Sequence, residues 1–155
     1  LLAQIRNEAE SLSAGRHTIS FEVEPGIDLA GNSGEITSAF SNLANNAVRY
    51  TPAGGRIRIQ WRAVGEGAQF SVTDSGIGIA AEHLPRLTER FYRVDRSRSR
   101  DTGGTGLGLA IAKHALARHQ AKLGIESEPG KGSCFTASFP RSRVLARLPQ
   151  SVALD

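Results

Sequence analysis

The stretch from residue 34 to residue 63, GEITSAFSNLANNAVRYTPAGGRIRIQWRA, contains two periodicities in succession. Its first half carries an apolar stripe at helical spacing and predicts a helix over residues 34–50. The residues of this stripe are Ile36, Phe40, Leu43, Ala47 and Val48. Pro52, Gly54 and Gly55 end the helix, and the alternation of Ile57, Ile59 and Trp61 then predicts a strand with one buried face. A long helix followed at once by such a strand favours an α/β fold.

The segments on either side continue this mixture of helices and strands. Strands are predicted at 17–24, 56–63, 68–73, 122–128 and 133–139, and helices at 1–14, 81–87 and about 106–120. Together they predict an α/β two-layer sandwich, with a mixed sheet of about five strands covered on one face by three helices. The domain is expected over 15–140, followed by a flexible C-terminal tail at 141–155. Because the chain has no methionine, we expect it to be a piece of a longer protein.

Composition excludes several classes of protein. With 155 residues, 39% of them hydrophobic, the chain is long enough for one domain with a core. It has no apolar run of the roughly 20 residues that a transmembrane helix needs, and its single cysteine, Cys134, excludes an internal disulfide. The formal charge is +4, but the arginines of segment 86–100 suit phosphate recognition better than diffuse attraction. Nucleic-acid binding would need aromatic residues interleaved with them, so no nucleic-acid partner is expected.

Three groups of residues could carry chemistry. The glycine-rich run 103–108 precedes a predicted helix, where unpaired amides and the helix dipole attract phosphate. Asn42, Asn46 and Arg49 share one helix face, and amide oxygens can ligate Mg²⁺. Asp74 ends a strand before a Gly-x-Gly sequence and could accept a hydrogen bond from an exocyclic amine. Each group also fits a structural role, as a turn, a solvated helix face or a capping carboxylate. The Walker and dinucleotide-binding patterns are absent.

Four segments in order give a more specific indication. They are Asn42–Thr51 (NLANNAVRYT), Asp74–Ile79 (DSGIGI), Glu89–Asp95 (ERFYRVD) and Gly104–Leu109 (GTGLGL). They resemble the N box, first glycine box, F box and second glycine box of the ATP-binding catalytic domain of sensor histidine kinases, within the superfamily of gyrase, Hsp90 and MutL. The resemblance covers about residues 15–140, and within the family it is strongest to the phosphate-regulon sensor kinases.

The resemblance implies that the cofactors are ATP and Mg²⁺ and assigns roles to the matched residues. Asn46 is expected to bind the metal, and Asn42 to assist at the metal and phosphates as a catalytic residue. Arg49 is expected near the phosphates and Tyr50 along the nucleotide. Around the base, the expected roles are recognition of the adenine amine by Asp74, close approach of the base at Gly76 and Gly78, and a lining contact from Ile79.

The remaining residues implied by the resemblance belong to a lid over the triphosphate. Arg93 is expected to reach the γ-phosphate as the second catalytic residue. The other members of this set are Phe91, Gly104, Thr105, Gly106, Leu107, Gly108 and Leu109. Members of the superfamily that hydrolyse ATP carry a glutamate base at the position of Asn42, and an amide cannot take a proton from water. We therefore expect a protein histidine kinase rather than a rapid ATPase.

The phosphoacceptor histidine of the family is expected to lie outside this chain. None of His17, His83, His114 and His119 has the family's acceptor context, and residues 1–14 are expected to finish a helix of the preceding dimerisation domain. The implied partners are that dimerisation and phosphoacceptor domain of the same parent and a PhoB-like response regulator. The chain is expected to be a cytoplasmic domain without membrane contact, in a parent anchored in the bacterial inner membrane. An anti-sigma-factor-type serine kinase and a non-catalytic nucleotide-binding module remain as alternatives.

Overall fold

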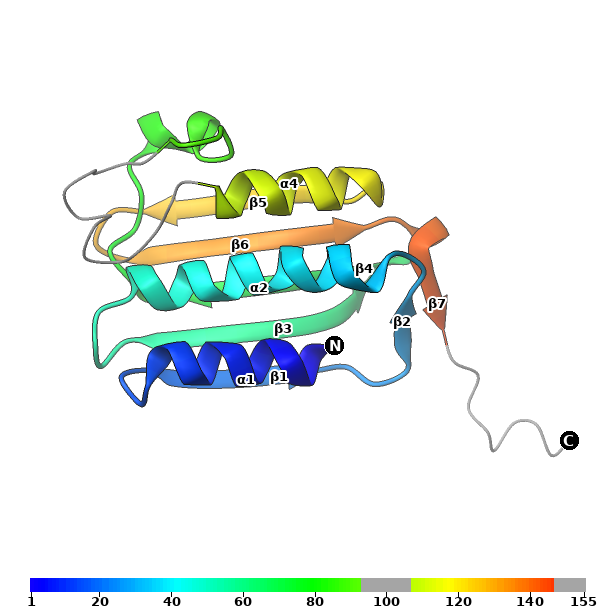
Figure 1. The fold of residues 1–155 in the computed structure, drawn as a ribbon, viewed down its shortest axis with the longest axis horizontal. Coiled ribbons are helices and arrows are strands. Elements are labelled where there is room, and N and C mark those ends of the chain that lie inside the picture. Colours follow the sequence, from blue (N-terminus) through cyan, green and yellow to red (C-terminus); the bar gives the residue numbers. More distant parts are fainter. Residues whose placement is uncertain (93–106, 147–155) are drawn as a thin grey trace, which may run out of the picture.

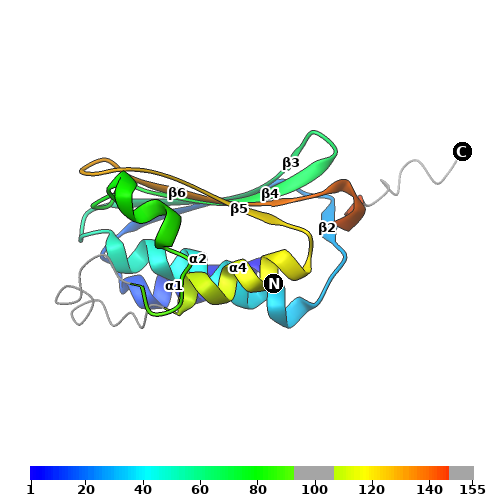
Figure 2. The same cartoon turned by 90° about the horizontal axis from the view of Figure 1, so that it is seen from above.

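The computed structural model describes residues 1–92 and 107–146, which form a sheet with helices on one of its faces (Figure 1, Figure 2). The five strands lie in the order β1-β3-β4-β6-β5. Their bounds are β1 (Thr18–Val23), β3 (Arg56–Val64), β4 (Gly67–Asp74), β5 (Lys122–Glu128) and β6 (Gly132–Phe139). β1 runs parallel to β3 and all other pairs are antiparallel. The predicted α/β sandwich with a mixed sheet of five strands is confirmed.

In the described part of the chain, three α-helices cover that face: α1 (Leu2–Ser13), α2 (Ser33–Tyr50) and α4 (Gly108–Arg118). α2 begins where the Asn32 side chain accepts the backbone N–H of Glu35 at 2.9 Å, and such a cap satisfies one of the amides left open at a helix start. The apolar stripe predicted for this helix is buried along its whole length. Since Ile5 and Ala9 are also fully buried, α1 shares the core of the same sheet.

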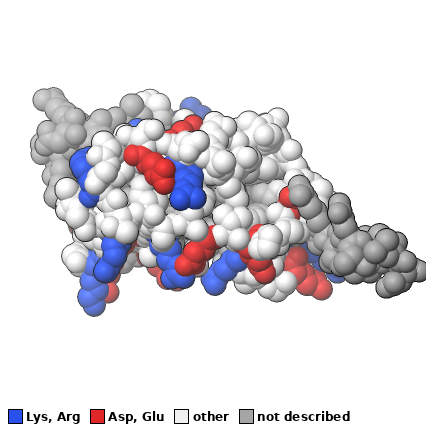
Figure 3. Space-filling view, turned by 90° about the horizontal axis from the view of Figure 1, so that it is seen from below, with Lys and Arg blue, Asp and Glu red and all other residues white. Residues whose placement is uncertain are grey.

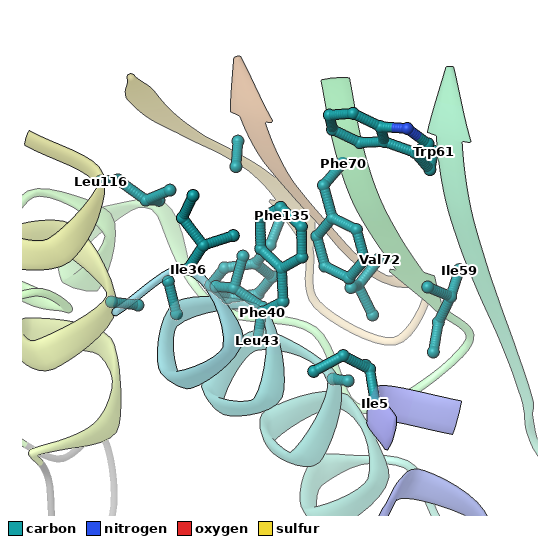
Figure 4. Packing of buried hydrophobic residues seen from close by; sticks show 14 of the residues in the cluster. Ile5, Ile36, Phe40, Leu43, Ile59, Trp61, Phe70, Val72, Leu116 and Phe135 are labelled. Carbon is teal, nitrogen blue, oxygen red and sulfur yellow. The ribbon is translucent and has the colours of Figure 1, made fainter. Parts of the chain in front are cut away.

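The centre of the core is aromatic (Figure 4). The ring of Phe40 on α2 stacks on that of Phe70 on β4, with centroids 3.9 Å apart and planes within 3°. Trp61 and Phe139 meet Phe40 at tilted or edge-on angles. Each buried side chain of this size contributes about 1.5–3 kcal/mol relative to exposure. The helix that carries the N box is therefore held against the middle of the sheet.

Short elements complete the structure. β2 (Ile27–Leu29) pairs antiparallel with β7 (Val144–Ala146), and a 3₁₀ turn, η2 (Arg141–Arg143), precedes β7. Regular structure thus continues past residue 140, where the sequence placed the end of the domain. The helix predicted at 81–87 is a 3₁₀ segment, η1 (Ala81–Arg86), and contains Pro85. Within the two described ranges, no helix combines the length and apolarity needed to cross a membrane.

A buried histidine fixes α4 against α2. His119 is 3% exposed, its Nδ1 lies 2.7 Å from the carbonyl of Ala115, and its Nε2 accepts the backbone N–H of Asn32 at 3.0 Å. Because one ring nitrogen faces an acceptor and the other a donor, the ring is neutral with its proton on Nδ1. An ion pair between Arg118 and Glu35, 2.7 Å long, lies beside it. The end of α4 is thereby tied to the start of α2, so the start of α4 lies beside the middle of α2 (Figure 1).

The side of the molecule that carries α1 and β1 has no single sign of charge. Figure 3 shows Lys and Arg side chains interspersed with Asp and Glu on this side. Arg6 pairs with Glu10, and Arg58 pairs with Glu22 at 2.8 Å. Because the solvent screens exposed pairs of this kind, they contribute little to stability. This side therefore does not present the uniformly basic patch that binds a nucleic-acid backbone.

Candidate functional site

The structure brings the N box and the second glycine box together. A Cβ built on Gly108, the first residue of α4, would lie 2.8 Å from Oδ1 of Asn42. The amide nitrogen of Asn42 donates to the carbonyl of Ser38 at 2.8 Å, which fixes the side chain with its oxygen toward α4. Among the described residues, no side chain caps the start of α4. The positive end of the α4 dipole, which favours an anion, thus lies beside an amide oxygen, which can ligate a metal ion.

The other polar residues of the N box follow along α2. Asn46 and Tyr50 are half-buried, whereas Arg49 is exposed. Within residues 1–92 and 107–146, the Asn46 side chain makes no hydrogen bond. Its amide oxygen is therefore available to a ligand, and Mg²⁺ prefers oxygen ligands of this kind while keeping several waters. The residues present fit a magnesium ion.

Asp74 lies at the end of β4 and is only 7% exposed. Its Oδ1 accepts the backbone N–H of Gly76 at 2.9 Å, and its carboxyl also accepts a backbone hydrogen bond from Ser133. Burial raises the pKa of Asp74 above its ordinary value, and the two backbone hydrogen bonds offset part of this rise. A carboxyl in this setting gains from a further donor, such as an exocyclic amine, that stabilises its charged form.

The glycines of the first glycine box are required by the protein's own backbone. A Cβ on Gly76 would lie 2.4 Å from the carbonyl oxygen of Tyr50. Gly78 has φ +73°, and a Cβ there would lie 2.0 Å from the carbonyl oxygen of Glu128. Gly76 thus lets the turn after β4 close onto the end of α2, beside Asp74. Next along the chain, the half-buried Ile79 donates its N–H to Ser127 Oγ at 2.7 Å and packs against the core.

The predicted lid is described only at its two ends. Phe91 is 69% exposed. Next to it, the Tyr92 hydroxyl hydrogen-bonds Nδ1 of His83, and the Arg86 guanidinium lies 4.5 Å from the centroid of the Tyr92 ring. At the other end, Leu107 and Leu109 are half-buried at the start of α4. Arg93, Gly104, Thr105 and Gly106 lie outside the described residues.

Three residues at this site were not singled out from the sequence. Thr51, directly after Tyr50, is 3% exposed, and its hydroxyl has no hydrogen-bond partner in the described part of the chain. His17 donates from Nε2 to the carbonyl of Thr51 at 2.6 Å, and Ser133 binds the Asp74 carboxyl through its backbone. Only Thr51 had a sequence signal, its place in the N box. The other two reach the site through contacts between distant segments.

Comparison with known proteins agrees with the fold. The sequence profile of the histidine kinase-, DNA gyrase B- and HSP90-like ATPase family matches residues 31–143. The phosphate regulon sensor protein PhoR of Pseudomonas aeruginosa is 61% identical over 145 residues, or 93% of this chain and 33% of that protein. PhoR of Haemophilus influenzae is 43% identical over 95% of this chain and 35% of its own length. The chain thus spans about a third of these relatives.

Solved structures show the same architecture. The mycobacterial sensor histidine kinase MprB matches with a TM-score of 0.77 and 24% identity, over 94% of this chain and 95% of that chain. Full-length ShkA, solved in complex with AMPPNP, matches with a TM-score of 0.76 and 27% identity, over 95% of this chain and 30% of that chain. The chain therefore belongs to the histidine kinase-, DNA gyrase B- and HSP90-like ATPase family, as a PhoR-like catalytic ATPase domain of the sensor histidine kinase type.

Proposed function

We propose that this domain binds Mg-ATP and donates the γ-phosphoryl group to a histidine on the dimerisation domain of its parent kinase. The proposal rests on two contacts that α2 makes at different points along its length. Asn42 meets the start of α4, and Tyr50 meets the turn that holds Gly76 beside Asp74. The two contacts are separated by about 12 Å along the helix axis. This separation suits a ligand with a base at one end and phosphates at the other.

Different residues of the chain would bind the base, the phosphates and the metal ion. The Asp74 carboxylate would accept the adenine amine, and the backbone N–H groups at the start of α4 would hold phosphate oxygens, with the amide oxygen of Asn42 beside them as an oxygen ligand for the metal. Asn46 would hold Mg²⁺, which neutralises phosphate charge when bound. Arg49, exposed at the last turn of α2, could reach the same phosphates. Phosphoryl transfer needs positioning and charge stabilisation rather than covalent chemistry from the protein, and these residues would supply both on the donor side.

The likeness to PhoR supports the remainder of the proposal. The phosphorylated histidine would pass its phosphoryl group to the aspartate of a PhoB-like response regulator, in phosphate-starvation signalling. The parent would be anchored in the inner membrane, with this domain in the cytoplasm. Because Asn42 replaces the glutamate base of the hydrolysing relatives, ATP would be kept for transfer instead of being hydrolysed rapidly.

Calorimetric titration with a non-hydrolysable ATP analogue, with and without Mg²⁺, tests the donor half. We expect saturable binding that depends on Mg²⁺. An absence of binding at millimolar analogue would contradict the proposal and favour a degenerate module that keeps the fold without its function. The acceptor half is tested by mixing the chain with Mg-ATP and a separately supplied PhoR-type dimerisation domain. We expect slow phosphorylation of its histidine, because the effective concentration that a tether provides is absent.

A further inference from the structure

The chain between η1 and residue 92 is fixed at several points, although most of it is exposed. Leu87 is 7% exposed, so its side chain anchors the start of this segment in the interior. Directly after it, Thr88 Oγ1 accepts a hydrogen bond from Nζ of Lys113 on α4 at 3.4 Å. Because α4 begins at the expected phosphate site, this contact keeps the segment close to that end of the candidate site.

Tyr92 is tied back to η1 by both its hydroxyl and its ring. The hydroxyl hydrogen-bonds Nδ1 of His83, and the two rings are tilted against each other with centroids 5.9 Å apart. On its other contact, the guanidinium of Arg86 lies 4.5 Å from the centroid of the Tyr92 ring, within the range of a cation–π interaction. Arg86 is itself paired with Glu89 at 2.7 Å. The side chain of Tyr92 is therefore held by two residues of one short element.

The other ring nitrogen of His83 sets the direction of the bond to Tyr92. A carboxylate oxygen of Glu82 lies 3.5 Å from Nε2 of His83. This acceptor favours a proton on Nε2, which leaves Nδ1 of the neutral ring to accept the Tyr92 hydroxyl. The His83 side chain is 23% exposed, so the bond is partly shielded from water, and a shielded hydrogen bond is stronger than one in open solvent.

The backbone of Phe91 indicates that these contacts constrain the chain. Phe91 has φ +65°, in the left-handed region that an aromatic residue rarely adopts. Because 69% of Phe91 is exposed, its own side chain has little packing to hold it in this conformation. Such a conformation persists only where the neighbouring structure imposes it. The neighbour that can do so is Tyr92, which is bonded to η1 directly after Phe91.

We infer that Tyr92 is a positioning residue for phosphoryl transfer, which fixes, through its bond to His83, the point from which the chain continues to Arg93. Arg93 lies outside the described residues, but consecutive Cα atoms are about 3.8 Å apart, so the place of Tyr92 limits where Arg93 can start. The sequence predicts that Arg93 reaches the γ-phosphate, and a guanidinium stabilises transferring charge only when it is held in place. The inference rests on the proposed function and extends it to the residue that positions this arginine.

Two single variants and their combination test the inference. Tyr92→Phe removes only the hydroxyl, and His83→Ala removes its partner. The chain is mixed with saturating Mg-ATP and a separately supplied PhoR-type dimerisation domain. We expect each variant to phosphorylate the acceptor histidine about 3- to 10-fold more slowly than wild type, the range that the loss of one hydrogen bond allows. The double variant should be no slower than the slower single variant, because both substitutions remove the same bond. Since ADP has no γ-phosphate, the affinity of Tyr92→Phe for ADP should be unchanged.

Glu82→Gln is the matched control, because Glu82 faces the other ring nitrogen of His83 and its side chain is 78% exposed. This variant should transfer at the wild-type rate, and a loss as large as that of Tyr92→Phe would overturn the inference.

The remaining outcomes separate this inference from the proposed function. A wild-type chain that transfers no phosphoryl group overturns both. If wild type transfers and Tyr92→Phe transfers equally fast, only the role of Tyr92 is overturned. The same holds if the losses of Tyr92→Phe and His83→Ala add in the double variant, since Tyr92 would then not act through His83. Weaker ADP binding by Tyr92→Phe would also overturn it, because the hydroxyl would then support the nucleotide site as a whole.

Discussion

The amide oxygen of Asn42 lies against Gly108, with 2.8 Å between that oxygen and the place of a Gly108 Cβ. This contact joins the N box on α2 to the first turn of α4, and only a residue without a side chain leaves the amide in place. The orientation of the amide is also fixed by the hydrogen bond that its nitrogen donates to the backbone carbonyl of Ser38. The geometry of the expected phosphate site therefore depends on a residue that has no functional group of its own.

Gly108→Ala should displace the Asn42 amide and break its hydrogen bond to Ser38. We expect the domain to lose about 1 kcal/mol of unfolding free energy and to bind a Mg²⁺-bound ATP analogue about tenfold more weakly. Denaturant unfolding and calorimetry measure the two effects. Gly124→Ala is the matched control, because the nearest atom to its Cβ would be 3.9 Å away. Equal analogue affinity in Gly108→Ala and wild type would remove Asn42 from the phosphate site.

Asn46→Ala should abolish the Mg²⁺ dependence of nucleotide binding, since it removes the expected metal ligand. Titrations of the analogue with and without Mg²⁺ would then coincide. Asn45→Ala is the control, because Asn45 is the neighbouring residue and its buried Oδ1 has no partner among the described residues. That variant should keep the Mg²⁺ dependence. Normal Mg²⁺-dependent binding by Asn46→Ala would show that the metal is held elsewhere.

The raised pKa of Asp74 makes the stability of the ligand-free domain depend on pH. The folded domain holds the Asp74 proton more tightly than the unfolded chain does. This contribution to stability is therefore complete below the ordinary carboxyl pKa and is lost as pH rises through the raised pKa. Melting curves of wild type and Asp74→Asn between about pH 4 and pH 7 measure it as a difference. A constant difference across that range would contradict the raised pKa.

Nucleotide affinity should change with pH in the opposite direction. An adenine amine donates a stronger hydrogen bond to the ionised carboxylate than to the protonated carboxyl, so affinity should rise as pH increases through the raised pKa of Asp74. Asp74→Asn should bind more weakly at neutral pH and lose this dependence. Calorimetry of both proteins over the same pH range provides the check. If Asp74→Asn bound the analogue as wild type does at neutral pH, the carboxylate would have no role in base recognition.

His119→Ala should destabilise the fold. It leaves the Asn32 N–H and the Ala115 carbonyl without their partner and opens a cavity beside Gly31. We expect the free energy of unfolding to fall by about 2–4 kcal/mol, measured by urea denaturation. His114→Ala on the same helix is exposed and should be near neutral. A loss under about 0.5 kcal/mol in His119→Ala would contradict the inference that the hydrogen bonds of His119 hold α4 against α2.

The sequence predicted those elements whose periodicity is long enough to read. The apolar stripe of α2 and the alternation of Ile57, Ile59 and Trp61 were both confirmed, because a buried face forces such spacing on helix and strand. β2 and β7 were not predicted. Each has three residues, too few for an alternation, and each strand's partner is at the opposite end of the chain.

The site was predictable where motifs exist and not where contacts are distant. The motifs singled out Asn42, Gly108, Asp74 and Gly76, and the structure places Asn42 against Gly108 and Asp74 beside Gly76. The bond from His17 to Thr51 and the clamp between His119 and Asn32, 87 residues apart, left no pattern in the sequence. A polar side chain whose partner is a distant backbone group has no characteristic neighbours, so only the folded structure reveals it.

Two neighbouring strands of the sheet are joined by a long stretch of chain that contributes to the candidate site. β4 and β6 are neighbours in the sheet, yet η1, α4 and β5 all intervene along the chain. The entropy lost in closing a loop grows only with the logarithm of its length, about 0.6 kcal/mol for each doubling. Residues could therefore be added or removed between Ile79 and α4 while the central strand pairs remain intact. The topology leaves this segment free to change in length, and hence in what it recognises, on an unchanged sheet.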